Sequence, residues 1–269
     1  MTHFKPKAKT NEFWNKEYDN PEHLTMGTEA ATDLVEFIAW ADRNAEWPAL
    51  PKHGMIVDIG CGNGRNIVPL CYEFNMNGLG TDISEVALAQ AKALIPETIK
   101  GLEEEGVSVN PGIKLEFKKQ AAQDPLPLED GSVDVVLDMM VSHQLVKSER
   151  EALAAEIARV VKPYGWLFYK TFLLEGDMNA KRMISEHPIT KDMVKSNPLL
   201  GDEDGKPEEN SYIHPQTKGI EHVSTEDDVY DLFGKYFKIY KVKKSHKHIK
   251  DGKPWKRRTM SVYMERLRD

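Results

Sequence analysis

The sequence has little cysteine and no long hydrophobic run, and these two scarcities exclude several classes of protein. The two cysteines, Cys61 and Cys71, are too few for a disulfide framework or a cysteine-based metal cluster. No apolar stretch approaches the roughly 18 to 20 residues that span a bilayer, and the first residues lack the apolar core of a signal peptide. We therefore expect a protein of the reducing cytoplasm, with no membrane partner and no metal site.

Net positive charge is confined to one segment, which we call the basic arm. The net charge is −7, yet residues 241–258 hold nine Lys or Arg and one Asp, so the rest of the chain is strongly acidic. Proteins that bind nucleic acids generally carry a positive face throughout. An acidic body with one basic arm therefore makes nucleic acid the less favoured partner.

The composition favours one large α/β domain, with or without an added cap. The chain has 269 residues, of which 40% are hydrophobic and 29% charged. These values are ordinary for a globular protein, and the length allows an ample core.

A glycine-rich stretch near residue 60 organises the chain. The apolar residues 55–57 lead to Asp58, and Gly60, Gly62 and Gly64 follow at alternate positions. This order predicts a buried parallel strand, a tight turn and the start of a helix. Glycine permits positive φ and lets a ligand lie against the backbone. The spacing differs from the Gly-x-Gly-x-x-Gly of dinucleotide-binding folds, which argues against a nicotinamide oxidoreductase.

A second acid stands where a ribose-binding carboxylate is expected. Residues 77–82 predict another short strand that ends in Asp82, roughly 20 residues beyond the glycine turn. Ser84 predicts the N-cap of the next helix. Together the two segments resemble motifs I and II of the class I S-adenosylmethionine-dependent methyltransferases, and the resemblance extends over most of residues 55–175.

The resemblance implies an α/β fold, a doubly wound, seven-stranded, mostly parallel sheet of the Rossmann-like methyltransferase type. It also implies S-adenosyl-L-methionine as the cofactor and S-adenosyl-L-homocysteine as the product. The glycine turn would approach the amino-acid part of the cofactor, Asp58 would bind the amino group directly or through water, and Asp82 would bind the ribose. The cofactor-binding candidates are Trp14, Tyr18, Asp58, Gly60, Cys61, Gly62, Gly64, Asn66, Asp82, Ile83, Gln120, Ala121, Asp138 and Met139.

One position departs from the family pattern. In the family, the loop after the third strand usually carries an acid near the adenine amine. Here the matching residues are Gln120, Ala121, Ala122 and Gln123. A Gln amide oxygen can accept a hydrogen bond from that amine in place of a carboxylate.

Hydrophobic periodicity and turn residues outline the other elements. The predicted helices cover residues 28–43, 86–105, 148–161 and 225–233. The second of them runs from 86 to 94, is expected to be interrupted at Pro96, and then continues to 105. The Lys-Pro-Tyr-Gly turn at 162–165 should end the third of these helices. The later strands are predicted to begin at 115 and to cover 133–137, 166–172, 237–242 and 259–267, the last two as an antiparallel pair.

Two segments are expected to enclose the site of a methyltransferase domain that covers residues 51–269. In the N-terminal segment, residues 1–50, Trp14 and Tyr18 share a helix face, and many methyltransferases begin with a similar lid; packing on the sheet edge explains the same pattern. Residues 173–222 form an insertion rich in Asp, Asn, Pro and Gly. Such insertions are usually disordered or functional, and we favour a substrate cap.

Methyl transfer from a sulfonium is an in-line displacement, which depends on positioning and needs neither a nucleophile nor a metal. A general base helps only when the acceptor must lose a proton. His143 and Asp138 are the catalytic candidates, and a structural histidine and a helix-capping aspartate are the alternatives. The substrate candidates are His143, Tyr169, Tyr212 and His214, of which the last two could instead pin the insertion to the body.

We therefore predict an S-adenosylmethionine-dependent methyltransferase that acts on a small molecule, as a monomer or a homodimer. A protein or RNA methyltransferase that uses the basic arm is one alternative, and a non-catalytic S-adenosylmethionine-binding protein is another. In the arm, Trp255 stands among Lys253, Lys256, Arg257 and Arg258, a combination that can stack on a planar group and pair with anions. The arm could thus bind an anionic acceptor, or its lysines could only protect an edge strand.

Overall fold

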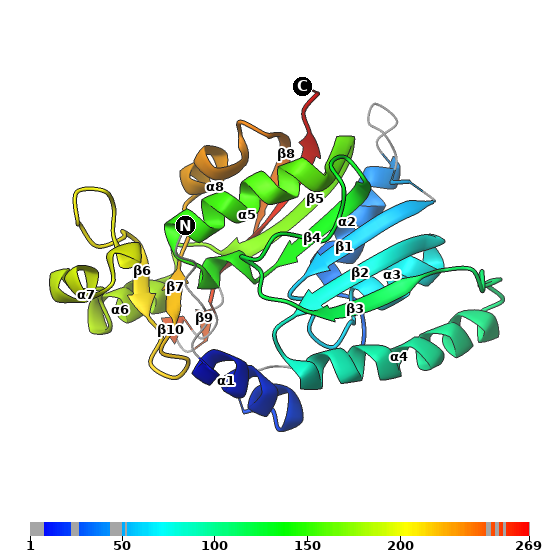
Figure 1. Cartoon of the computed structure of the whole chain (residues 1–269), viewed down its shortest axis with the longest axis horizontal. Coiled ribbons are helices and arrows are strands. Elements are labelled where there is room, and N and C mark those ends of the chain that lie inside the picture. The colour runs from blue at the N-terminus through cyan, green and yellow to red at the C-terminus, as the bar shows by residue number, and fades with distance from the viewer. Residues whose placement is uncertain are drawn as a thin grey trace.

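The computed structural model describes residues 8–22, 27–43, 50–51, 53–245, 249–250, 253–254 and 257–268. Its centre is a seven-stranded sheet in the order β3-β2-β1-β4-β5-β11-β8 (Figure 1). The strands are β1 (Gly54–Ile59), β2 (Met76–Asp82), β3 (Leu115–Lys119), β4 (Val133–Met139), β5 (Val161–Phe172), β8 (Phe237–Lys244) and β11 (Thr259–Arg266). The first five are parallel, and β11 pairs antiparallel with β5 and β8. The predicted fold is confirmed, including its antiparallel pair.

Helices cover both faces of the sheet. They are α1 (Ala8–Asp19), α2 (Thr32–Arg43), α3 (Ile67–Glu73), α4 (Glu85–Glu104), α5 (Lys147–Val160) and α8 (Glu226–Phe233). Successive strand residues point to opposite faces. Val57 therefore packs with α5 and α8, whereas Ile56 packs with α2 and α3. Burial on both faces explains why the central strands read as near-continuous apolar runs.

The helix after β2 corrects one prediction. α4 is continuous over 20 residues, so the expected interruption at Pro96 is wrong. Pro96 has no N–H and so cannot donate a hydrogen bond to the carbonyl of Lys92. Both residues are exposed, so water can hydrogen-bond to that carbonyl instead. Ser84 caps the helix as predicted, because its side chain accepts a hydrogen bond from the backbone N–H of Ala87.

The Lys-Pro-Tyr-Gly segment also differs from its prediction. α5 ends at Val160, and residues 162–165 lie inside β5 rather than before it. The pairing of β5 with β4 shifts register just after Val133, and such an irregularity accommodates a proline because no ladder N–H is needed there. Lys162 Nζ lies 2.7 Å from Asp134 Oδ2 of β4, which ties the irregular segment to the sheet.

The insertion, residues 173–222, is folded. It contains α6 (Met178–Glu186), α7 (Lys191–Ser196), the short 3-10 helix η2 (Pro198–Leu200) and a hairpin of β6 (Ser211–Ile213) and β7 (Ile220–His222). These elements lie together at one end of the molecule (Figure 1). Its polar composition reflects helix caps, since Asp177 caps α6 and Thr190 caps α7.

A buried polar network fastens the insertion to the body. Glu208 pairs with Arg150 of α5 and lies 3.2 Å from His222 Nδ1. Ser211 Oγ lies 2.9 Å from the same nitrogen, and Asp228 Oδ2 of α8 lies 3.7 Å from His222 Nε2. This grouping of Ser, His and acids lies behind the hairpin, away from the cavity described below. We therefore regard it as a docking network, in which buried charges are paired.

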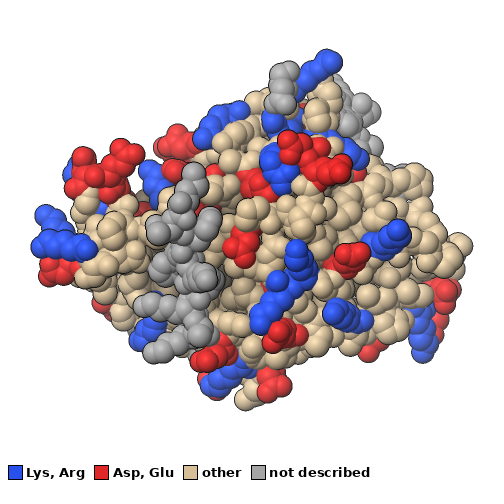
Figure 2. All heavy atoms as spheres, viewed as in Figure 1, with Lys and Arg blue, Asp and Glu red and all other residues tan. Residues whose placement is uncertain are grey.

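The surface of the described residues adds three observations. No described helix is long and apolar enough to cross a membrane. The described residues contain no cluster of His, Cys, Asp or Glu side chains suited to a metal ion. Figure 2 shows acidic and basic side chains interspersed over the face that it presents.

Candidate functional site

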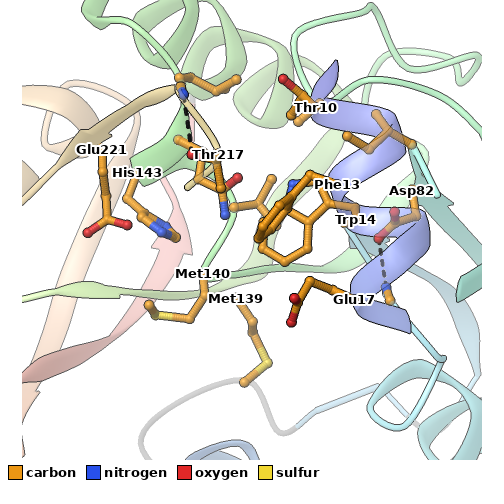
Figure 3. Close-up of a pocket in the computed structure, with 18 of the residues that line it drawn as sticks. Thr10, Phe13, Trp14, Glu17, Asp82, Met139, Met140, His143, Thr217 and Glu221 are labelled. Atoms are coloured by element: carbon orange, nitrogen blue, oxygen red, sulfur yellow. Dashed lines mark hydrogen bonds between the residues drawn. The ribbon is translucent and has the colours of Figure 1, made fainter. Parts of the chain in front are cut away.

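A cavity of about 540 Å³ lies at the carboxyl ends of the central parallel strands, where ligands bind in open α/β sheets. We call one side the glycine-turn half; it is formed by Gly60, Cys61, Gly62, Asn66, Asp82 and Ile83. We call the other side the insertion half; it is formed by His143, Phe172, His214, Thr217, Ile220 and Glu221. Phe13 and Trp14 of α1 project into the space between the halves (Figure 3).

Gly62 and Gly64 of the turn have different structural roles. Gly62 has a φ of 56°, and a Cβ there would overlap the hydroxyl of Tyr18, so glycine allows Tyr18 to close over the turn. Gly64 has a φ of 78° and does not line the cavity; a Cβ there would lie 2.8 Å from Ala91 Cβ of α4. The cofactor contact predicted for Gly64 is thus corrected to a helix-packing role.

Asp82 is fixed on the cavity wall by backbone donors. Its Oδ2 accepts a hydrogen bond from Gly62 N–H at 2.9 Å, and its Oδ1 accepts one from Ser84 N–H at 2.8 Å. Burial raises the pKa of Asp82, and the backbone donors oppose that rise. The carboxylate therefore joins the end of β2 to the glycine turn at the position predicted for it.

Gln120 follows β3 and lines the same wall. Its Nε2 donates to the carbonyls of Asp124 and Pro125 at 3.3 and 3.1 Å. This fixes the amide so that Oε1 is the end left to accept a hydrogen bond. Ala122, rather than the predicted Ala121, lines the cavity beside it.

Asp58 and Asp138 lie beneath the cavity wall instead of on it. Both are almost completely buried, and neither lines the cavity. Asp138 Oδ1 accepts a hydrogen bond from Ser142 N–H at 3.3 Å, so it caps the short 3-10 helix η1 (Ser142–Gln144). Its expected catalytic contact is corrected to this capping role. Burial raises the pKa of Asp138 to about 6.

Asp58 carries an unused acceptor. Its Oδ2 is buried and has no hydrogen-bond partner among the described residues. Burial, and then the charges of Asp82 and Asp138, raise the pKa of Asp58 well above its usual value. A group that brings a positive charge or a donor to the glycine turn would relieve this cluster of acids.

His143 lies on η1 and lines the insertion half. Its ring meets Phe172 edge-on, with 4.9 Å between the ring centroids. Burial lowers the pKa of His143 to about 4, although the charge of Glu221 opposes this. The imidazole is therefore neutral at neutral pH and retains a basic nitrogen.

Glu221 is a site residue that sequence reasoning missed. It lies on β7 and lines the cavity, with His143 as its neighbour in Figure 3. Its Oε1 accepts hydrogen bonds from Arg257 Nη1 at 2.8 Å and from the hydroxyl of Tyr212. A three-residue strand gives almost no periodic signal, so the sequence around Glu221 offered little to mark it.

The remaining substrate candidates separate into two groups. His214 lines the insertion half. Tyr169 and Tyr212 are buried and do not line it. Tyr169 packs on Phe233 of α8, 4.9 Å between ring centroids, because its position in β5 faces that side of the sheet. Tyr212 instead supports the hairpin, which is the pinning role considered as its alternative.

α1 covers the cavity and is anchored to α4. Ser84 Oγ donates to Asn15 Oδ1 at 2.8 Å, and Gln90 Nε2 donates to the Tyr18 carbonyl at 2.7 Å. Trp14 and Tyr18 both line the cavity, as their shared helix face predicts. Burial raises the pKa of the Tyr18 hydroxyl, so it remains protonated.

The basic arm differs from its prediction. Trp255 and Lys256 lie outside the described residues. Arg257 is bound between carboxylates, and Arg258 is buried, with Nη2 donating to the Ser245 carbonyl at 2.6 Å. Arg258 is thus internal and Arg257 is already paired with two carboxylates, which contradicts the expectation that they bind an anionic acceptor.

Comparison with known proteins gives a consistent assignment. Residues 57–169 match the family described as "Methyltransferase domain". The ubiquinone biosynthesis O-methyltransferase of Burkholderia pseudomallei is 32% identical over 135 residues, which cover 50% of this chain and 49% of that protein. The 2-methyl-6-phytyl-1,4-hydroquinone methyltransferase of Synechocystis sp. is 25% identical over 186 residues, which cover 66% of this chain and 53% of that protein. The chain spans about half the length of the curated relatives that it matches.

Two solved structures share the fold. A SAM-dependent methyltransferase from Methanosarcina mazei has a TM-score of 0.61 at 21% identity, covering 90% of this chain and 100% of that one. The 1,6-didemethyltoxoflavin-N1-methyltransferase of Burkholderia thailandensis, solved with bound 1,6-didemethyltoxoflavin and S-adenosylhomocysteine, has a TM-score of 0.61 at 13% identity, covering 100% of this chain and 93% of that one. At these identities the likeness establishes the fold.

Residues 57–169 are therefore a methyltransferase domain, and the chain has the fold of the class I S-adenosylmethionine-dependent methyltransferases, a class whose cofactor is S-adenosylmethionine. The residues present fit that cofactor on two grounds of their own. The buried acids beneath the glycine turn suit a ligand with positively charged groups, and Asp58 Oδ2 lacks a partner among the described residues.

Proposed function

We propose that the protein is an enzyme that transfers the methyl group of S-adenosylmethionine to a small molecule held in the same cavity. One observation carries the proposal: the glycine-turn half and the insertion half share a continuous space of about 540 Å³. That volume is in the range of small-molecule sites. α1 and the insertion both line the space, and such enclosure suits a small acceptor.

In this proposal the glycine-turn half holds the cofactor. The backbone at Gly60 and Gly62 lies against the amino-acid part, and Asp58 interacts with the amino group from beneath. Asp82 accepts hydrogen bonds from the ribose hydroxyls, and Gln120 Oε1 accepts one from the adenine amine. The rest of this wall consists of Trp14, Tyr18, Cys61, Asn66, Ile83 and Met139.

Bound S-adenosylmethionine supplies an electrophilic methyl group on a positively charged sulfur. The chain itself orients the acceptor in line with that group, which supplies much of the rate acceleration. His143 stands in the insertion half as a neutral imidazole and takes the proton of an acceptor that must lose one. Asp138 is a positioning residue, because it caps the 3-10 helix that carries His143. His214 contributes to the acceptor wall.

Two segments enclose the reaction in this proposal. The N-terminal segment, residues 1–50, acts as a lid through α1, and the insertion, residues 173–222, acts as a substrate cap on the domain of residues 51–269. The hydrogen bonds of α1 to Ser84 and Gln90 support the first role. The presence of His214, Thr217 and Glu221 on the cavity wall supports the second. Excluding water strengthens electrostatic interactions inside the site.

The small-molecule acceptor is favoured over the alternatives by two observations. The matched relatives are named for ubiquinone biosynthesis and for a hydroquinone. The alternative of a protein or RNA acceptor depends on the basic arm, in which Arg257 is paired with carboxylates and Arg258 is buried. Cys61 and Cys71 are free and buried, which supports a site of action in the reducing cytoplasm. We propose a monomer or a homodimer.

Two measurements test the proposal. Isothermal titration calorimetry should detect binding of S-adenosylhomocysteine to the full chain. Incubation with methyl-labelled S-adenosylmethionine and a library of small hydroxylated and amino aromatic compounds should then label at least one compound. Binding of the cofactor product without label transfer to small molecules, proteins or RNA would indicate the non-catalytic alternative. Failure to bind S-adenosylhomocysteine would refute the cofactor assignment.

A further inference from the structure

Among the described residues of the insertion, Glu221 is the acidic side chain that lines the cavity. It is held in one orientation. Tyr212 stands directly opposite it in the β6–β7 hairpin, and residues paired in this way share a face. The hydroxyl of Tyr212 and Nη1 of Arg257, the latter at 2.8 Å, both donate to Glu221 Oε1.

Arg257 is itself fixed from behind. Its Nε donates to Asp177 Oδ2 at 2.9 Å, and its guanidinium carbon lies 3.9 Å from the centre of the Phe172 ring. Asp177 is buried, and its other oxygen caps α6 by accepting a hydrogen bond from Ala180 N–H at 2.9 Å. Glu221 is thus positioned by groups from the end of β5, from the insertion and from the segment before β11, which preorganises the carboxylate.

The second carboxylate oxygen of Glu221 is available to a ligand. No described residue donates to Oε2, and the side chain borders the cavity beside His143 (Figure 3). Burial favours the neutral acid, but the charge of Arg257 and the hydrogen bonds from Arg257 and Tyr212 oppose it, and the pKa of Glu221 lies below its usual value. An ionised oxygen without a donor on a cavity wall is suited to a hydrogen-bond donor of the ligand.

The charges around this oxygen disfavour an anion. Asp177 and Glu221 oppose the single positive charge of Arg257, so the group carries a net negative charge. Arg257 is not on the cavity wall, and its Nη2 is buried. Lys170, a cation that does border the cavity, lies 2.5 Å from Asp33 Oδ2. A carboxylate or phosphate placed beside Glu221 would therefore meet a like charge.

The neighbouring walls are aromatic. Phe172 borders the insertion half, and Phe13 and Trp14 of α1 project toward it (Figure 3). Aromatic side chains favour flat ligands through stacked and edge-to-face contacts. We infer that Glu221 is the acceptor-recognition residue, and that the acceptor is a neutral or cationic aromatic molecule that donates a hydrogen bond from a hydroxyl or N–H group to Glu221 Oε2. This inference rests on the proposed function.

A matched ligand series tests the inference with the full chain saturated with S-adenosylhomocysteine. The probes share one ring system: 1-naphthol and 1-naphthylamine carry a donor, 1-methoxynaphthalene carries none, and 1-naphthoate and 1-naphthyl phosphate are anions. Calorimetry on the wild-type complex should show the two donors binding about 10-fold or more tighter than the ether, as expected for hydrogen bonds to a charged group. The anions should bind most weakly.

Variants assign the preference to one residue. Glu221→Gln keeps the shape but presents an amide, and it should remove the advantage of the donors over the ether while leaving the affinity for S-adenosylhomocysteine unchanged. Glu203→Gln, an equal charge change at an exposed position of the insertion, should keep the wild-type order and serves as the control. Should Glu221→Gln fail to fold, the order of the probes on the wild-type protein still decides the question.

Two results overturn the inference. One is tightest binding by an anion, or binding by none of the series, in a protein that binds S-adenosylhomocysteine. The other is an unchanged donor preference in a folded Glu221→Gln protein. Either result leaves the proposed methyl transfer standing. Loss of S-adenosylhomocysteine binding in the wild-type protein is the separate result that removes the proposed function itself.

Discussion

The two halves of the cavity are built in different ways. Four of the six residues that define the glycine-turn half lie in the single stretch 60–66, and Asp82 and Ile83 are added from the end of the neighbouring strand. The insertion half depends on side chains from distant segments: Arg257 binds Asp177, which lies 80 positions earlier in the chain, and Glu221, which lies 36 positions earlier. A half built mainly from one local stretch is encoded by a short motif, whereas a half built from distant side chains is encoded only by the whole fold.

Their electrostatics differ as well. Beneath the glycine turn, burial raises the pKa of Asp58 and Asp138, and the nearby carboxyls raise that of Asp58 further. In the insertion half, Arg257 already neutralises much of the charge of Glu221. The first half is therefore suited to a ligand that brings positive charge, as a sulfonium cofactor does, and the second half needs only hydrogen bonding from its ligand.

The largest effect should come from breaking the insertion half alone. Arg257→Met leaves Asp177 and Glu221 without their cation, and breaking such a buried pair costs about 3 to 5 kcal/mol. Urea denaturation should show a fall in the free energy of unfolding of that size. Arg182→Met removes an exposed pair with Glu186 and should cost less than about 0.5 kcal/mol. Equal losses in the two variants would contradict the described support of Glu221.

Acidification should reveal the contribution of His143, in the insertion half, to the free energy of unfolding. Its pKa is about 4 in the folded protein and about 6.5 in an unfolded chain. The unfolded chain binds the proton first, so this residue lowers stability as the pH falls from about 6.5 to about 4, by about 1.4 kcal/mol per pH unit at most. His143→Phe should abolish that contribution.

The measurement is the difference in unfolding free energy between wild type and His143→Phe from pH 7 to pH 4. The difference is needed because Asp138, whose pKa is raised to about 6, acts in the opposite direction: its contribution is lost as the pH rises from its unfolded pKa through the folded one. A difference that stays constant with pH would show that His143 titrates normally.

A change in the glycine-turn half should affect cofactor binding instead of the free energy of unfolding. Asp82→Ala removes a carboxyl acceptor from the wall, and we expect the affinity for S-adenosylhomocysteine to fall by about 1.5 to 3 kcal/mol, as for hydrogen bonds to charged groups. Calorimetry measures this. Asp124→Ala, at an exposed position beside the same half, is the control and should bind normally. Unchanged affinity in folded Asp82→Ala would remove the ribose-binding role.

The smallest effect should come from loosening the lid that spans both halves. Asn15→Ala deletes the acceptor of the Ser84 hydroxyl, a hydrogen bond worth about 1 kcal/mol, so affinity for S-adenosylhomocysteine should fall about fivefold. Lys16→Ala, which removes only an exposed pair with Glu22, should bind as wild type does. If both variants bind normally, α1 packs on α4 without acting as a lid.

The sequence alone determined the fold and the glycine-turn half. Alternating and continuous apolar runs fix strands and helices locally, and the N-cap at Ser84 was read correctly from residue type. Asp82 and Gly62 are brought together because two adjacent parallel strands end at the same edge of the sheet. Prediction was wrong at Pro96, because residue type alone does not tell whether water can replace a missing hydrogen bond.

Only the tertiary structure decided the insertion half. Asp138 and Tyr212 have the chemistry of site residues, yet they lie beneath the wall because of what covers them. Arg257 was considered as a contact for an anionic acceptor and is instead bound between Asp177 and Glu221. Local patterns specify which face of an element a side chain occupies, whereas burial and ion pairing depend on the segments that pack against that face. Glu221 is recognisable as a site residue only in the folded structure, where those segments place it on the cavity wall.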